Sequence, residues 1–90
     1  MVTLPETPAL RLFSRAWCHL CEDMLSALEA LRGEPGLVAF EIEVLDVDAD
    51  PALEEKYDER VPVLVDALGN ELCHYFLDTT KVREYLSAFR

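Results

Sequence analysis

The sequence predicts an α/β domain in which three helices flank a four-stranded mixed sheet, in the order β-α-β-α-β-β-α. Three observations lead to this prediction. Apolar residues follow strand-like spacing in four segments and helix-like spacing in three. A helical segment separates the first two strand segments, which favours a right-handed parallel crossover. A short turn containing glycine separates the last two, which favours an antiparallel hairpin. With 90 residues, the chain is expected to form one domain over residues 1–90.

The first half of the chain is expected to supply two strands and the helix between them. Residues 1–8 contain two prolines and are expected to form an irregular N-terminal segment before the first strand. Residues 9–14 are a short apolar run, typical of a strand that is buried on both faces. From Cys18 to Arg32, apolar residues recur at helical spacing, and glycines follow directly. Phe, Ile and Val alternate with Glu over residues 40–44, which predicts a strand with one solvent-facing side, near a sheet edge.

The second half is expected to supply two helices and a hairpin. Asp50-Pro51 is typical of a helix start, because the Asp can cap the helix and the Pro fits its first turn. Residues 62–65 and 71–77 are apolar enough for strands, and residues 67–70 form the turn between them. One of the polar residues 78–80 can cap a last helix. The apolar residues of that helix share one face: Val82, Tyr85, Leu86 and Phe89.

Composition narrows the classes of function. The apolar fraction is 51%, which is enough for a core, and no apolar run approaches the ~20 residues that span a membrane. The net charge of −10 disfavours nucleic acid and anionic membranes as partners. The N-terminus lacks the basic and apolar regions of a signal peptide, so we expect the protein in the cytoplasm. Three cysteines are an odd number, which argues against a disulfide framework.

Cys18-His19-Leu20-Cys21 is the most informative motif, because it lies where the first strand gives way to the first helix. Free backbone N–H groups and a partial positive charge at a helix N-terminus favour a thiolate over a thiol. We expect Cys18, at the helix start, to be the nucleophile. Cys21 lies one turn further in and is expected to resolve the mixed disulfide that Cys18 forms.

With these elements in place, the chain resembles the thioredoxin fold and, within it, the small glutaredoxin-like proteins. The resemblance rests on the order of elements, on Cys18-x-x-Cys21 after the first strand, and on Val61-Pro62-Val63-Leu64, where the family has a cis-proline at the start of its third strand. It implies a thiol–disulfide oxidoreductase with a cis peptide bond before Pro62, whose bend brings the Val61 backbone beside Cys18. That backbone is then expected to pair with a client peptide or glutathione.

The resemblance also assigns expectations to side chains near the cysteines. Glutaredoxins often have a Lys where this chain has Arg15, so Arg15 is expected either to bind a glutathione carboxylate or to be solvated. A protonated His19 is expected to stabilise the Cys18 thiolate, with a plain exposed histidine as the alternative. Trp17 is expected to shield the thiol or to cover the core. The Gly-Gly turn and following acidic residue of glutaredoxins are missing near Gly69, which predicts poor glutathione binding.

The expected protein is a monomer without a built-in cofactor. It exchanges disulfides with a protein or a low-molecular-weight thiol, and receives electrons from glutathione or a reductase. Two alternatives stay open. One is a metal or iron–sulfur carrier, in which His19, Cys73 or His74 supplements the two cysteine ligands. The other is a binding module that kept the fold without catalysis. Cys73 is expected to be structural, with a redox or ligand role as its alternative.

Overall fold

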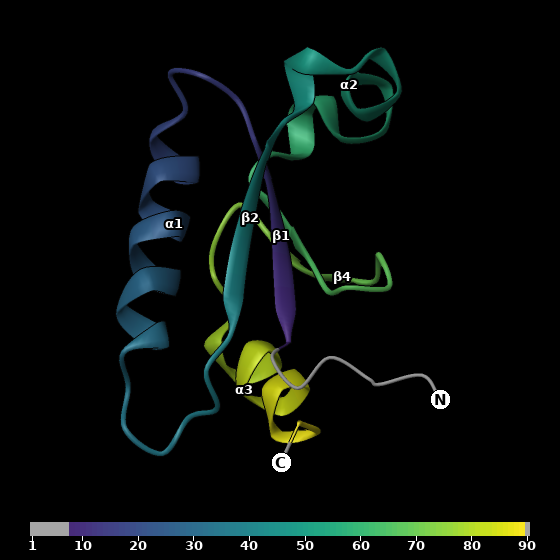
Figure 1. Cartoon of the computed structure of the whole chain (residues 1–90). Helices are drawn as coiled ribbons and strands as arrows, with labels where there is room; N and C mark the ends of the chain where they lie inside the picture. The colour runs from purple at the N-terminus through teal and green to yellow at the C-terminus, as the bar shows by residue number, and fades with distance from the viewer. Residues whose placement is uncertain (1–7, 90) are drawn as a thin grey trace.

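The computed structural model describes residues 8–89 and has the predicted α/β architecture (Figure 1). Its helices are α1 (His19–Arg32), α2 (Pro51–Tyr57) and α3 (Thr79–Ser87), with short 3-10 turns η1 (Val47–Ala49) and η2 (Asp58–Arg60). Its strands are β1 (Ala9–Ser14), β2 (Glu41–Asp46), β3 (Val63–Val65) and β4 (Glu71–His74). Within the described residues, no helix is long and apolar enough to cross a bilayer.

The four strands form one mixed sheet in the order β2-β1-β3-β4. The β1–β2 pair is parallel, as expected for two strands joined through a helix. The β1–β3 and β3–β4 pairs are antiparallel, which confirms the predicted hairpin. Strand β2 lies at one edge of the sheet and its glutamates are exposed, as predicted. Val44 is exposed as well, at 48%, so the prediction of a single solvent-facing side is wrong at that position. Because β1 and β2 run parallel, the β1–α1 connection and η1 meet at the same end of the sheet.

Two hydrophobic clusters hold these layers together. The first cluster joins the sheet to α1 and α3 through Leu10, Leu12, Met24, Leu28, Leu31, Phe40, Leu64, Val82 and Leu86. The second cluster joins the sheet to α2 and to the start of α1 through Phe13, Cys21, Val47, Tyr57, Val61, Val63 and Val65. Its central contact is the stacked ring pair of Phe13 and Tyr57, whose centroids lie 4.4 Å apart. The buried side chains of β1 therefore serve both clusters, although Arg11 is exposed, so the prediction of two buried faces is wrong at that position.

The helix starts follow the predicted capping chemistry. The Asp50 carboxylate accepts a hydrogen bond from the Ala52 N–H at 2.9 Å at the start of α2. The Asp78 carboxylate accepts a hydrogen bond from the Lys81 N–H at 3.1 Å and so caps α3. Helix α3 ends at Ser87, so Phe89 lies just beyond the helix. These caps fix where α2 and α3 begin relative to the sheet.

Strand β4 is shorter than predicted. It was expected to run from residue 71 to residue 77, but it ends at His74. Tyr75 has a φ of +63°, a left-handed conformation that turns the chain out of the strand direction. The Tyr75 N–H still donates to the Pro62 carbonyl at 2.9 Å, which holds the turn beside the start of β3. As a result, residues 75–77 form a loop at the same end of the sheet as Pro62.

Candidate functional site

The two cysteines of the motif form a disulfide at the start of α1. Their Cα atoms lie 5.2 Å apart, and Cys18 is the N-cap residue of the helix. The Cys18 Sγ accepts a hydrogen bond from the Cys21 N–H at 3.1 Å. Cys18 is partly exposed, whereas Cys21 is only 4% exposed and packs in the second hydrophobic cluster. This geometry gives Cys18 access to a partner and keeps Cys21 behind it.

Val61 and Pro62 lie beside this pair, as the resemblance implied. The peptide bond between them is cis. Val61 belongs to the same hydrophobic cluster as Cys21, and Cys18 packs against that cluster. Pro62 is buried at the start of β3. The structure thus brings the cysteine pair and the Val61–Pro62 bend together, although the predicted role of the Val61 backbone in binding a client stays a prediction.

Arg15 has partners within the chain that sequence analysis did not foresee. Its guanidinium donates to both carboxylate oxygens of Asp48, at 3.1 Å from Nε and 2.7 Å from Nη2. It also donates to the carbonyl of Asp58 at 3.0 Å and to the Asp58 carboxylate at 3.1 Å. Four of the five N–H groups of the guanidinium are therefore engaged. The expectation of a solvated side chain is wrong, and a ligand carboxylate has to compete with two aspartates for Arg15.

This contact shifts the pKa values of its partners. The hydrogen bonds from Arg15 hold the pKa of the Asp48 carboxyl below its ordinary value of 3.8, and those to Asp48 raise the pKa of Arg15. The Arg15 side chain is 29% exposed, so water weakens the attraction. Since Arg15 follows β1, whereas Asp48 lies in η1 and Asp58 in η2, the contact ties three segments together at the end of the sheet that carries Cys18.

Replacing Arg15 with glutamine is expected to raise the pKa of Asp48 toward its ordinary value, because the carboxylate loses its cationic donor. In the parent protein, the stabilising effect of the ionised Asp48 is present above pH 3.8 and is lost as the pH falls through the lower folded-state pKa. An NMR titration of the carboxyl carbons measures this change. Arg83→Gln is the matched control. It removes a similar contact, through which Arg83 lowers the pKa of Glu34, and leaves the contact between Arg15 and Asp48 in place. An Asp48 pKa that Arg15→Gln leaves unchanged contradicts the contact.

Aromatic side chains near the cysteines are exposed, which sequence analysis missed. Trp17 is 98% exposed and has a φ of +62°, so the prediction that it shields the thiol or covers the core is wrong. In the loop after β4, Phe76 is 70% exposed and Tyr75 is 39% exposed. Their position beside α1 depends on the early end of β4, which the sequence pattern does not reveal.

The remaining candidate residues do not converge on one point. His19 is exposed in the first turn of α1. His74 Nδ1 lies 3.0 Å from a carboxylate oxygen of Glu71, on the sheet edge. Cys73 packs against the first hydrophobic cluster, and burial raises the pKa of its thiol. Across residues 8–89, no group of three or more His, Cys, Asp or Glu side chains is placed to hold one metal ion. The ligand set of the metal-carrier alternative is therefore not assembled within one chain.

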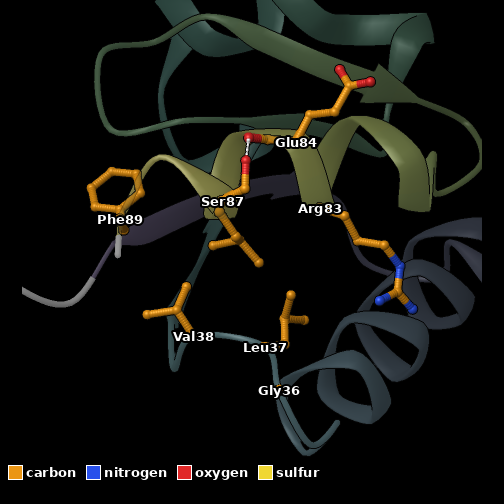
Figure 2. A pocket seen from close by; sticks show the side chains of 8 residues that line it. Gly36, Leu37, Val38, Arg83, Glu84, Ser87 and Phe89 are labelled. Carbon is orange, nitrogen blue, oxygen red and sulfur yellow. Dashed lines mark hydrogen bonds between the residues drawn. The ribbon is translucent and has the colours of Figure 1, made fainter.

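A pocket lies at the opposite end of the sheet from the cysteines, between the α1–β2 connection and α3 (Figure 2). Leu37 and Val38 form one side of it and Phe89 lies at another. Arg83 lines the pocket, but its guanidinium is held by both carboxylate oxygens of Glu34, at 2.7 and 2.8 Å. The hydroxyl of Ser87 donates to a backbone carbonyl of α3 at 2.7 Å. The Arg83 guanidinium and the Ser87 hydroxyl thus already have partners, and none of the residues that line this pocket is a cysteine.

Comparisons with known proteins agree with this geometry. The family described as a glutaredoxin-like domain (DUF836) matches residues 9–87. Protein Ne2328 of Nitrosomonas europaea, known from a solution NMR structure, is 39% identical with a TM-score of 0.79, over 96% of this chain and 99% of its own. Protein XcR50 of X. campestris, known from an X-ray structure, is 37% identical with a TM-score of 0.66, over 88% of this chain and 96% of its own.

A chloroplastic thioredoxin z is 20% identical with a TM-score of 0.65, over 93% of this chain and 79% of its own, a likeness that concerns the fold alone. No curated protein matches the sequence. The family match covers nearly the whole described chain and includes both cysteines and the Val61–Pro62 bend. With its mixed sheet and three flanking helices, the chain has the thioredoxin fold, and it belongs to the glutaredoxin-like domain family.

Proposed function

We propose that this protein is a thiol–disulfide oxidoreductase that cycles Cys18 and Cys21 between the dithiol and the disulfide. The observation that carries the proposal is the hydrogen bond from the Cys21 N–H to the Cys18 Sγ at the start of α1. A donor in this position, together with the helix dipole, stabilises a negative charge on the sulfur. The resolving sulfur already lies within bonding reach of Cys18. Both steps of a disulfide exchange can then proceed at one place.

The proposed reaction has two steps. The Cys18 thiolate attacks one sulfur of a client disulfide, which forms a mixed disulfide and releases the first client thiolate. The Cys21 thiolate then attacks the Cys18 Sγ, which restores the Cys18–Cys21 disulfide and releases the second client thiolate. The two protons of the protein dithiol end on the two client thiols. Two electrons pass to the client, and a thiol reductant must return them.

Glutathione or a protein reductase is the proposed source of those electrons, and a protein disulfide is the proposed client. Two observations favour weak binding of glutathione. Its carboxylates have to compete with Asp48 and Asp58 for Arg15. Glutathione is also anionic, and the protein carries a net charge of −10. We therefore propose that glutathione supports turnover poorly compared with a dithiol reductant.

Reduced protein is expected to react with iodoacetamide fastest at Cys18, because only this cysteine is both partly exposed and placed at the helix start. Cys73 is the internal control, since burial raises the pKa of its thiol and so lowers its reactivity. Brief labelling at neutral pH, followed by peptide mass spectrometry, measures the order. Preferential labelling of Cys21 or Cys73 contradicts the assignment of the nucleophile.

Turnover distinguishes the proposed enzyme from a binding module with the same fold. Reduced protein is mixed with a small-molecule disulfide, and the released thiol is followed while a dithiol reductant regenerates the protein. An oxidoreductase releases many equivalents of thiol above the uncatalysed rate. A protein that reacts at Cys18 but releases no more than one round of thiol is a binding module instead.

A further inference from the structure

The contact of Arg15 with Asp48 and Asp58 lies at the end of the sheet where α1 begins and α2 lies (Figure 1). We call these three residues the Arg15 clamp. Arg15 stands three residues before Cys18, in the connection from β1 to α1, and Asp58 stands three residues before Val61. The clamp consists of four hydrogen bonds of 2.7 to 3.1 Å. It therefore joins the segment that leads into Cys18 to the segment that leads into Val61.

The clamp lies over apolar packing that holds the same part of the fold from inside. Each clamp residue is within two positions of a buried residue of the second hydrophobic cluster, namely Phe13, Val47 and Tyr57. Stacked rings hold the end of β1 against the end of α2, and this packing does not depend on Arg15. Release of the clamp is therefore expected to leave the cluster in place and to loosen mainly the connection that follows β1.

Cys18 depends on this connection for its place at the helix. As the N-cap residue it has an extended backbone, with φ −106° and ψ 104°, and is only half inside the helix. Its Sγ accepts the Cys21 N–H at 3.1 Å, and its carbonyl accepts the Glu22 N–H at 3.1 Å. In the oxidised protein the disulfide also holds Cys18. In the dithiol this bond is absent, so the connection and its clamp carry more of the task.

The charge of Arg15 does not by itself favour a thiolate at Cys18. The clamp contains one cation and two carboxylates, so its three side chains together carry one negative charge. The first turn of α1 adds a further carboxylate, Glu22, and the titratable His19. An attraction between the guanidinium and the sulfur is thus opposed by more than one neighbouring acid. The placement of the chain is the effect on Cys18 that the clamp does favour.

We propose that Arg15 is a positioning residue, whose contact with Asp48 and Asp58 holds Cys18 at the N-cap of α1 when the cysteine pair is reduced. The inference rests on the proposed oxidoreductase function and adds the residue that places its nucleophile. Without the clamp, the connection moves, and the Cys18 Sγ loses the Cys21 N–H for part of the time. The thiolate is then less stabilised and forms only at higher pH.

The test follows the alkylation of Cys18 by iodoacetamide in reduced protein across a range of pH, with peptide mass spectrometry to identify the labelled site. The midpoint of this profile reports where the thiolate forms. Arg15→Gln is expected to raise the midpoint by about half a pH unit or more, which corresponds to partial loss of one hydrogen bond to a charged sulfur. Arg83→Gln is the matched control, because it breaks a similar contact with Glu34 and leaves the clamp intact. It is expected to leave the midpoint unchanged.

Two further variants separate positioning from charge. Arg15→Lys keeps the charge, but one ammonium group cannot replace the guanidinium fork, so the midpoint is expected to rise. Asp48→Ala removes a negative charge, which by itself lowers the midpoint, and also removes two hydrogen bonds of the clamp, which raises it. We expect a rise, because water screens the charge at this exposed site. The double variant of Arg15→Gln and Asp48→Ala is expected to match Arg15→Gln, since both changes break one contact.

The outcomes separate this inference from the proposed function. No shift in Arg15→Lys together with a lower midpoint in Asp48→Ala assigns Arg15 an electrostatic role and overturns the positioning role. No shift in Arg15→Gln, or an equal shift in Arg83→Gln, overturns it as well. Circular dichroism checks that each variant is folded, and Arg15→Lys decides the matter if Arg15→Gln is not. Turnover of a small-molecule disulfide by the parent protein is measured alongside, and its absence contradicts the proposed function instead.

Discussion

Cys21→Ser is expected to abolish turnover and to leave a mixed disulfide on Cys18. In the parent protein, Cys21 lies one helical turn from Cys18 and forms a disulfide with it. Without this second sulfur, the Cys18 thiolate still attacks a disulfide, but nothing displaces the attached group. After brief exposure to oxidised glutathione, intact-mass spectrometry is expected to show one glutathionyl group on nearly every molecule. Peptide mapping is expected to place this group on Cys18.

Two matched variants make this experiment decisive. Cys18→Ser removes the proposed nucleophile, so it is expected to lose turnover without forming the adduct. Cys73→Ser is expected to keep turnover, because Cys73 packs against the first hydrophobic cluster and burial raises the pKa of its thiol. If Cys18→Ser traps glutathione as readily as Cys21→Ser, the roles of the two cysteines are reversed, or neither cysteine has a specific role in disulfide exchange.

The features that sequence analysis predicted correctly depend on short stretches of chain. Strand β1 has the bounds that its apolar run indicated, and Cys18 caps α1 because the motif lies directly at the strand-to-helix junction. The Asp50-Pro51 start of α2 and the Asp78 cap of α3 follow from the hydrogen-bonding chemistry of one or two side chains. The cis bond before Pro62 was implied by the resemblance.

The features that sequence analysis missed depend on contacts between distant segments or on a single backbone angle. Arg15 meets Asp48 and Asp58, which are 33 and 43 residues away in the chain. No local pattern distinguishes these two aspartates from the other acids between residues 41 and 59. The end of β4 is set by the left-handed φ of Tyr75, a residue type that normally favours strands. Trp17 also has a left-handed backbone, and its exposure was not indicated by the sequence pattern.

Leu12→Ala is expected to lower the free energy of unfolding by about 2–5 kcal/mol, which is the usual cost of removing a large side chain from a core. Leu12 is completely buried in β1, where it pairs with Val44 on one side and Leu64 on the other. A small domain has only about 5–15 kcal/mol of stability in total, so this loss is a large share. Equilibrium unfolding in urea, followed by circular dichroism, measures the change as a shift of the midpoint at constant slope.

Leu68→Ala is the matched control, because the same atoms are removed from a side chain that is 88% exposed in the β3–β4 turn. Its effect is expected to stay within about 0.5 kcal/mol. Equal losses in Leu12→Ala and Leu68→Ala contradict the assignment of Leu12 to the core. Because β1 leads directly into the Cys18 segment, Leu12→Ala protein that stays folded is also expected to position Cys18 less firmly. Slower disulfide exchange in Leu12→Ala than in Leu68→Ala then links the packing of the central strand to the reactivity of the cysteine at its end.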